Sequence, residues 1–195
     1  MSAKTFKRIV FGAARFYAQS DAGDPATKKL LGFTRGGAFN VERTVEQIEV
    51  DGLKTPTKGQ NVKRDVMAKI EVNALQIDSA ILPTLYGGMS AADGSGDDLG
   101  KKIITEATKY LCSDYIPLII MEAEYKDGSL LEIELDNGLG VGNTEMSFED
   151  KSEVVFSGEL VAHAVDTGSV AQGTAPYRIK IGGEPADLDT VESCG

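Results

Sequence analysis

The sequence of 195 residues has no tryptophan, one histidine, two cysteines and six prolines. Because Cys112 and Cys194 are far apart and only one histidine is present, there is neither a zinc-ligand set nor a disulfide framework, and a reducing compartment is the simplest setting. No apolar run reaches the ~20 residues that cross a bilayer. The basic start lacks a leucine-rich segment and a cleavage site, so we expect no signal peptide and no membrane partner.

Sequence patterns for catalysis are also scarce. His163 has no histidine or cysteine at a ligand spacing, and no serine lies in a G-x-S-x-G turn, so we interpret His163 as a partly buried strand residue with a hydrogen bond. The glycine string at 138–142 looks like a phosphate loop, but a strand rather than a helix is expected after it, which favours a plain connection. The sequence therefore predicts no enzyme, no cofactor and no metal site.

The 20 basic and 30 acidic residues are unevenly distributed along the chain. Residues 1–69 hold 13 bases and seven acids, a net charge of +6, and the remaining 126 residues hold seven bases and 23 acids, a net charge of −16. If these halves form different surfaces, copies of the molecule attract one another head to tail. A harmless fluctuation over solvated surfaces is the alternative. The overall net charge of −10 argues against a basic groove that grips nucleic acid.

Most of the chain has the pattern of β-strands. Between Val66 and Ile77 apolar and polar residues alternate, which is typical of an antiparallel strand with one buried face. In the segment Glu153–Val165, the side chains of Phe156, Leu160 and Ala162 share one side. These patterns predict one mainly β domain over residues 1–195.

Two segments and the chain end depart from the strand pattern. Residues 87–100 contain five glycines and three aspartates without an apolar period, so we expect a flexible loop there, either a tolerated insertion or a segment that becomes ordered at a subunit contact. Apolar residues at helical spacing then predict one amphipathic helix over Lys101–Cys112, with Cys112 as a small core residue at its end. Residues 182–195 carry four acids and no base, which predicts a frayed acidic tail.

Two predicted strands, Leu118–Tyr125 and Leu130–Asp136, flank the turn sequence Lys126–Ser129. A two-residue loop would mix charged and apolar side chains on each face, whereas a three-residue loop with Gly128 in the left-handed conformation separates them. The three-residue loop puts four carboxylates on one face, namely Glu122, Glu124, Glu132 and Glu134. It also sets Glu122 opposite Glu132. A sequence tolerates such a like-charge pair where the face is merely solvated, or where its negative charge has a function.

Short motifs, each a strand with a turn, follow one another in order along the chain. They are Leu31-Gly32-Phe33, Gly36-Gly37-x-Phe39, Glu49 to Gly52, Pro56-x-Lys58-Gly59, the strand Val66–Ile77, the turn Asn137-Gly138, Phe148 to Lys151, and Pro176 to Ile179. In this order and spacing, over about Phe11–Ile181, the chain resembles the tail tube (major tail) proteins of long-tailed bacteriophages. The segment at 87–100 has no counterpart in the family pattern.

The resemblance implies a tail-tube-like antiparallel β-sandwich or barrel with one flanking α-helix. Such subunits form hexameric rings that stack head to tail into a hollow tube, which conducts DNA. The implied partners are further copies of the chain, the tape measure protein, and the tail terminator and baseplate proteins, with DNA passing transiently. The implied location is the tail of the virion, after assembly in the host cytoplasm. Type VI secretion tubes and contractile-tail inner tubes use the same fold, so the type of tail stays open.

Charge adds two hypotheses about such a tube. Six copies give roughly −60 per ring, and an acidic inner wall repels the phosphate backbone so that DNA slides. We therefore expect lumen-facing residues among Glu122, Glu124, Glu132 and Glu134, and we expect a contact between rings at the loop that carries Asp51, Lys54 and Lys58. The alternatives are a related ring-forming protein, such as a tail terminator, baseplate or secretion-tube subunit, or a small β-rich enzyme or ligand carrier.

Overall fold

The computed structural model describes residues 10–32, 34–47, 61–75, 79, 81–125, 128–143, 145–147, 154–164 and 175–182. The strands are β1 (Val10–Gln19), β2 (Lys28–Leu30), β3 (Thr34–Gln47), β4 (Asn61–Ala74), β5 (Met89–Asp93), β6 (Lys102–Glu106), β7 (Ile116–Tyr125), β8 (Leu130–Gly140), β9 (Glu145–Ser147), β10 (Val155–Val161) and β11 (Tyr177–Ile181). The helical elements in these residues are the short helix α1 (Ile81–Leu85) and three 3-10 turns, η1 (Pro25–Thr27), η2 (Gly96–Asp98) and η3 (Cys112–Asp114).

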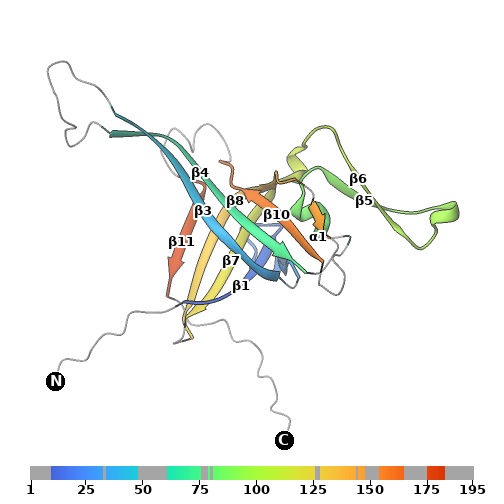
Figure 1. The fold of residues 1–195 in the computed structure, drawn as a ribbon, viewed down its shortest axis with the longest axis horizontal. Helices are drawn as coiled ribbons and strands as arrows, with labels where there is room; N and C mark the ends of the chain where they lie inside the picture. The colour runs from blue at the N-terminus through green and yellow to red at the C-terminus, as the bar shows by residue number, and fades with distance from the viewer. Residues whose placement is uncertain are drawn as a thin grey trace, which may run out of the picture.

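The main body is a β-sandwich built on antiparallel pairs (Figure 1). The hydrogen-bonded order is β2-β1-β7-β8-β10-β4-β3, with β11 added beside β8 and β9 beside β10. Strand β8 belongs to both layers, because residues 131–135 pair with β7 and β11 whereas Leu139 and Gly140 pair with β10. One layer is therefore β2-β1-β7-β8-β11, and the other is built on β3, β4, β9 and β10. Of the two architectures expected from the sequence, the sandwich is confirmed and a closed barrel is not formed.

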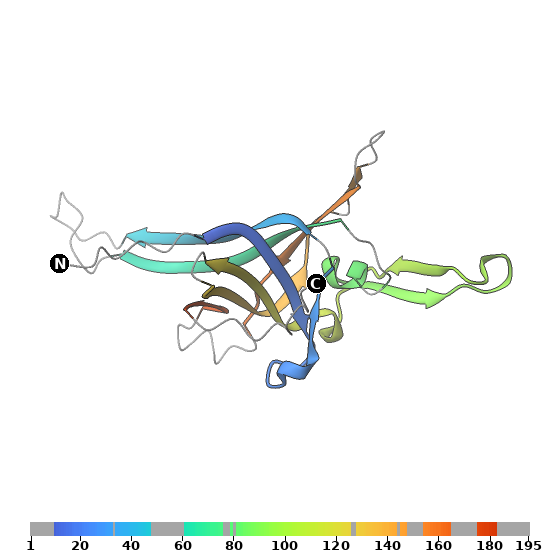
Figure 2. The same cartoon turned by 90° about the horizontal axis from the view of Figure 1, so that it is seen from below.

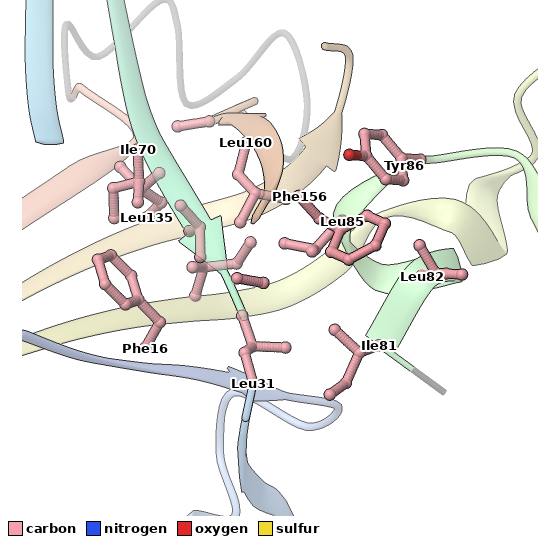
Figure 3. Packing of buried hydrophobic residues seen from close by; sticks show 14 of the residues in the cluster. Phe16, Leu31, Ile70, Ile81, Leu82, Leu85, Tyr86, Leu135, Phe156 and Leu160 are labelled. Carbon is pink, nitrogen blue, oxygen red and sulfur yellow. The ribbon is translucent and has the colours of Figure 1, made fainter. Parts of the chain in front are cut away.

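The core fills the space between the two layers (Figure 3). Phe16 of β1 and Leu135 of β8 meet Ile70 of β4 and Leu160 of β10, and all four side chains are fully buried. Gly37 of β3 lies directly over Phe16, where a Cβ atom at position 37 would come within 2.5 Å of the ring. Burial of such side chains supplies most of the stability of a sandwich, at ~25 cal/mol for each Å² of apolar surface removed from water.

The predicted strand at Val66–Ile77 is confirmed up to Ala74. Its apolar positions Ala68, Ile70, Val72 and Ala74 are buried, while Glu71 on the other face is exposed. The strand begins earlier than expected, at Asn61, because it pairs with β3 along nearly its whole length. The predicted side of the later strand is also confirmed, since Phe156, Leu160 and Ala162 are all buried. That strand is shorter than expected, with its end at Val161.

The hairpin of β7 and β8 has the register predicted from its side chains. Glu122 lies opposite Glu132, and Gly128 has a φ of 80°, which is the left-handed conformation. The backbone N–H of Tyr125 donates to the carbonyl of Ser129, so the loop contains three residues as expected.

Two ribbons extend from the sandwich in opposite directions (Figures 1 and 2). One is the outer part of the long pair β3 and β4, and the other is the isolated pair β5 and β6, which forms a sheet of its own. Helix α1 lies at the base of the second ribbon, where Ile81, Leu82 and Leu85 close one end of the core (Figure 3). The hydroxyl of Tyr86 donates to the carbonyl of Ser157 at 2.8 Å and fixes this end to β10.

The predictions for residues 87–112 are wrong. The segment expected as a loop contains β5, and the segment expected as a helix contains β6, which pairs with β5 from Asp93↔Lys102 to Met89↔Glu106. Gly96 and Gly100 have φ values of 63° and 86° and form the turn that reverses the chain. The β-branched run Ile103-Ile104-Thr105 favours a strand, and the side chains of Ile103, Tyr110 and Leu111 from the expected apolar stripe are exposed.

Two smaller predictions are corrected as well. Cys112 is exposed at the start of η3 instead of filling the core, since the helix that would have buried it does not form. Gly138 and Gly140 belong to the end of β8 and not to a connection. At both positions a larger residue would collide with the core: a Cβ would come within 2.4 Å of Ile119 at position 138 and within 2.2 Å of the Leu85 carbonyl at position 140.

Candidate functional site

The candidate site is the charged outer face of the layer β1-β7-β8-β11, which carries the four predicted carboxylates. The register places Arg15, Glu122, Glu132 and Lys180 side by side across these four strands. Directly opposite residues of an antiparallel pair share a face, so the row reads positive, negative, negative, positive. The unfavourable neighbours Glu122 and Glu132 are thus flanked by a cation on each side.

Each of these two glutamates has an ion-pair partner. Lys180 Nζ lies 2.8 Å from Glu132 Oε1, and Lys28 of β2 pairs with Glu122. The ammonium of Lys28 also lies 4.2 Å from the centre of the Tyr17 ring. Besides solvation or a function of the negative charge, these contacts explain why the sequence tolerates Glu122 opposite Glu132. Neighbouring strands supply cations that an isolated hairpin lacks.

Glu134 is the most buried charged residue of this face, with 5% of its surface exposed. Arg178 Nε donates to Glu134 Oε2 at 2.7 Å, and Lys180 pairs with the other carboxylate oxygen. Arg178 also donates to both oxygens of Asp136, at 2.8 and 3.0 Å. Strand β11 is therefore attached to β8 by a continuous set of ion pairs as well as by backbone hydrogen bonds.

This arrangement shifts the pKa values of its members. Burial by itself raises the pKa of Glu134, but the hydrogen bonds and charges of Lys180 and Arg178 outweigh it and lower the pKa below its usual value. The hydrogen bond to Glu134 raises the pKa of Arg178 in turn. Glu134 is thus held as a carboxylate that accepts hydrogen bonds, and it is a poor candidate for a general acid.

The four predicted lumen residues share one face, as expected, but they do not present four free charges. Glu122, Glu132 and Glu134 are neutralised by cations of β2 and β11, and Glu124 is the exposed member with no ion pair to another described residue. The residues that sequence reasoning missed are Arg15, Lys28, Arg178 and Lys180. A signal was present, because the alternation of Arg178 and Lys180 with apolar residues matches the alternation of Glu132 and Glu134.

The other candidate residues are distributed over the rest of the chain. His163 lies just after β10, half-buried, with its Nδ1 at 3.0 Å from the carbonyl of Val161 and its ring edge-on to Tyr115. Its half-buried position fits the structural interpretation given to it, but His163 lies beyond the end of the strand rather than within it. The predicted ring-contact residues Asp51, Lys54 and Lys58 lie outside the described residues, as do Cys194 and all of the predicted tail at 182–195 except Gly182.

A pocket of about 590 Å³ lies between the β1–β2 connection, helix α1 and turn η3. Its floor is apolar, with Leu31, Ile81 and Ile116, and Figure 3 shows Leu31 and Ile81 near each other at this end of the core. Lys29 is the one charged residue in the lining, all of which lies in the described part of the chain. The lining therefore offers apolar contact, the hydroxyl groups of serine, threonine and tyrosine side chains and one positive charge, and it brings together no acid–base pair.

Within the described ranges, no group of three or more histidine, cysteine, aspartate or glutamate side chains is placed to hold a metal ion. None of the helices described there is long and apolar enough to span a membrane. Comparison with protein families and with curated proteins finds no match to the sequence.

Proposed function

We propose that the chain is a structural subunit of a phage tail tube, which forms stacked hexameric rings whose lumen conducts DNA during ejection. The observation that carries the proposal is the exposure of large apolar side chains on the two opposed ribbons. Val45 and Met67 on one ribbon are 56% and 48% exposed, and Leu99 and Ile103 on the other are 82% and 41% exposed. Exposed apolar surface is a mark of a protein–protein interaction site, and we take the partner to be another copy of the chain.

The free edge of the sandwich supports the same proposal. Strand β3 is 14 residues long and stands last in the hydrogen-bonded order, so one of its sides has no strand partner in the described residues. Soluble monomers usually shorten or cover such an edge, because it pairs readily with another chain. An edge of this length suits a subunit whose sheet continues into its neighbour in a ring.

The charged face is compatible with a conduit for DNA. Its carboxylates are matched by arginine and lysine in ion pairs, so few cations are left to bind phosphate. A wall of paired charges with exposed Glu124 would bind DNA weakly, which is what passage through a tube requires.

Sedimentation velocity over a wide range of protein concentration tests the proposal. A tube subunit gives species that grow without limit as the concentration rises, since head-to-tail contacts do not close. A tail terminator or baseplate ring gives one species that stops growing. A monomer at the highest concentrations reached, with turnover of a small compound, would overturn the proposal in favour of an enzyme.

A further inference from the structure

The ribbon of β5 and β6 ends in a well-defined tip whose large apolar side chain is not buried against the rest of the molecule. Leu99 follows turn η2 at the tip and is 82% exposed, the highest value among the large apolar residues described. Backbone hydrogen bonds from Gly94 to Lys101 and from Leu99 to Gly96 fix the shape of the tip. Gly94 is packed so closely against Asp98 that a Cβ at position 94 would come within 2.2 Å of the carbonyl oxygen of Asp98.

The charge of the tip is as well defined as its shape. Asp98 pairs with Lys101 at 2.7 Å, and Asp93 pairs with Lys102 at 2.6 Å. Asp97 is exposed and has no ion-pair partner among the described residues. The tip therefore presents one unpaired negative charge two residues before its exposed leucine.

The pocket beside α1 has the complementary properties. It has an apolar floor at Leu31, Ile81 and Ile116 and a volume of about 590 Å³, which exceeds what one leucine side chain fills. Its single charge is the exposed Lys29, which has no ion-pair partner among the described residues. The apolar residue and the unpaired aspartate at the tip thus match a pocket that has buried apolar residues in its lining and an unpaired lysine.

We infer that the β5–β6 tip of one copy docks in this pocket of a second copy, with Leu99 on the apolar floor and Asp97 beside Lys29. The inference rests on the proposed function and deepens it, since it names one contact between copies. The preformed tip lowers the entropy that docking must overcome. A two-stranded ribbon is also marginally stable by itself in water, so a partner surface stabilises it.

Charge reversal on each side of the contact tests the inference. Asp97→Lys places two positive charges together at the contact, and Lys29→Glu places two negative charges together there. Each variant alone should need an at least tenfold higher concentration to associate, because like charges at an interface strongly oppose binding. An equimolar mixture should recover association, since the reversed tip of one variant and the reversed pocket of the other again join opposite charges.

Two controls separate this contact from charge effects in general. Lys109→Glu makes the same reversal on an exposed lysine that lies outside both ribbons and outside the pocket lining, and it should leave association within about twofold of wild type. Leu99→Ser should weaken association both alone and in an equimolar mixture with either charge-reversal variant, because neither variant restores the apolar contact. Circular dichroism of each variant checks that the sandwich remains folded.

The outcomes distinguish this inference from the proposed function. Tubes that form equally well from Asp97→Lys alone would overturn the docking contact and leave the tail tube proposal standing. Pairs or closed oligomers that are lost in each variant and restored by mixing would support the contact and contradict the tube. A wild-type protein that stays monomeric, or a mixture that fails to associate although both variants are folded, would overturn the docking contact.

Discussion

At the scale of single residues, Glu134 contributes both to the stability of the fold and to the charged outer face. Its carboxylate is buried, and its partners Arg178 and Lys180 both come from β11. Because its pKa is lowered on folding, its stabilising contribution is present above the unfolded pKa of about 4.3 and is lost as the pH falls through the folded value.

We expect Glu134→Gln to lower the free energy of unfolding by about 1 to 2 kcal/mol at pH 7, since two cations lose a buried partner. Below about pH 4.3 the difference from wild type should shrink, because the unfolded chain is protonated first, and it should vanish as the pH falls through the lower pKa of Glu134 in the folded protein. Urea unfolding followed by circular dichroism at a series of pH values measures both effects. Glu124→Gln is the matched control on the exposed part of the same strand pair. If the free energies of unfolding of Glu134→Gln and wild type depended on pH in parallel, the account would be contradicted.

Gly140 gives a second prediction at this scale. A Cβ there would lie 2.2 Å from the carbonyl oxygen of Leu85, which is backbone and has little freedom to move. Gly140→Ala should therefore destabilise the protein by about 1 to 3 kcal/mol, as overpacking of a core does. Thermal unfolding measures this loss. Gly23→Ala is the matched control in an exposed turn, where the nearest atom is a side-chain oxygen at 3.4 Å, and an equal loss there would count against the explanation.

The charged residues show how far sequence reasoning reaches. Segregation of side chains within one hairpin was enough to predict Glu122 opposite Glu132. Their partners Lys28 and Lys180 come from strands 94 and 48 positions away in the chain, respectively. The hairpin sequence does not show which distant strand becomes its neighbour, so the neutralisation of this face could not be predicted from the hairpin by itself.

At the scale of elements, the pair β5 and β6 shows where the helical spacing of apolar residues led to a wrong prediction. Ile103, Ile104, Ala107, Tyr110 and Leu111 fit a helical stripe, yet Ile103, Tyr110 and Leu111 are exposed. A helical stripe indicates a helix only where a surface exists to bury it, and the sequence does not say whether one exists. The strand β4 was predictable because the opposite layer buries its apolar face from Ala68 to Ala74.

Replacement of residues 91–104 by Asn-Gly tests the role of the ribbon. Ser90 and Thr105 lie directly opposite each other, so a two-residue turn can join them. The sandwich should keep its fold, with a midpoint of thermal unfolding within about 5 °C of wild type, because Ile104 is the one removed residue, all of them described, that packs against the core. Association measured by sedimentation velocity should be lost. An unfolded product would show that the ribbon belongs to the folding unit, and unchanged association would show that it makes no contact between copies.

At the scale of the whole molecule, the uneven charge and the opposed ribbons lead to the same expectation of head-to-tail association. The fold class was predictable from the alternating patterns of its strands, and the direction of the ribbons was not. Ribbon direction depends on where β3 and β4 leave the sandwich, which is a property of the assembled sheet and of its register shift between Thr44 and Val45.

Lys54 and Lys58, in the part of the sequence between β3 and β4, supply a prediction at this scale. Lys54→Glu combined with Lys58→Glu should shorten the tubes or prevent elongation, because reversed charges would oppose the acidic remainder of the next ring. The folding of the monomer should be unchanged, since the turn-forming residues of this segment and its lysines predict exposure to solvent. Tube length in electron micrographs measures the effect. Lys54→Arg with Lys58→Arg keeps the charge and should keep the tube length. Full-length tubes from the glutamate variant would show that Lys54 and Lys58 take no part in the stacking contact.

The central claim, that this chain builds a hollow tube from copies of itself, is tested most directly by negative-stain electron microscopy of the purified, concentrated wild-type protein. The account predicts long cylinders of constant width with a stain-filled bore and six subunits in end views. Featureless single particles at every concentration would contradict it.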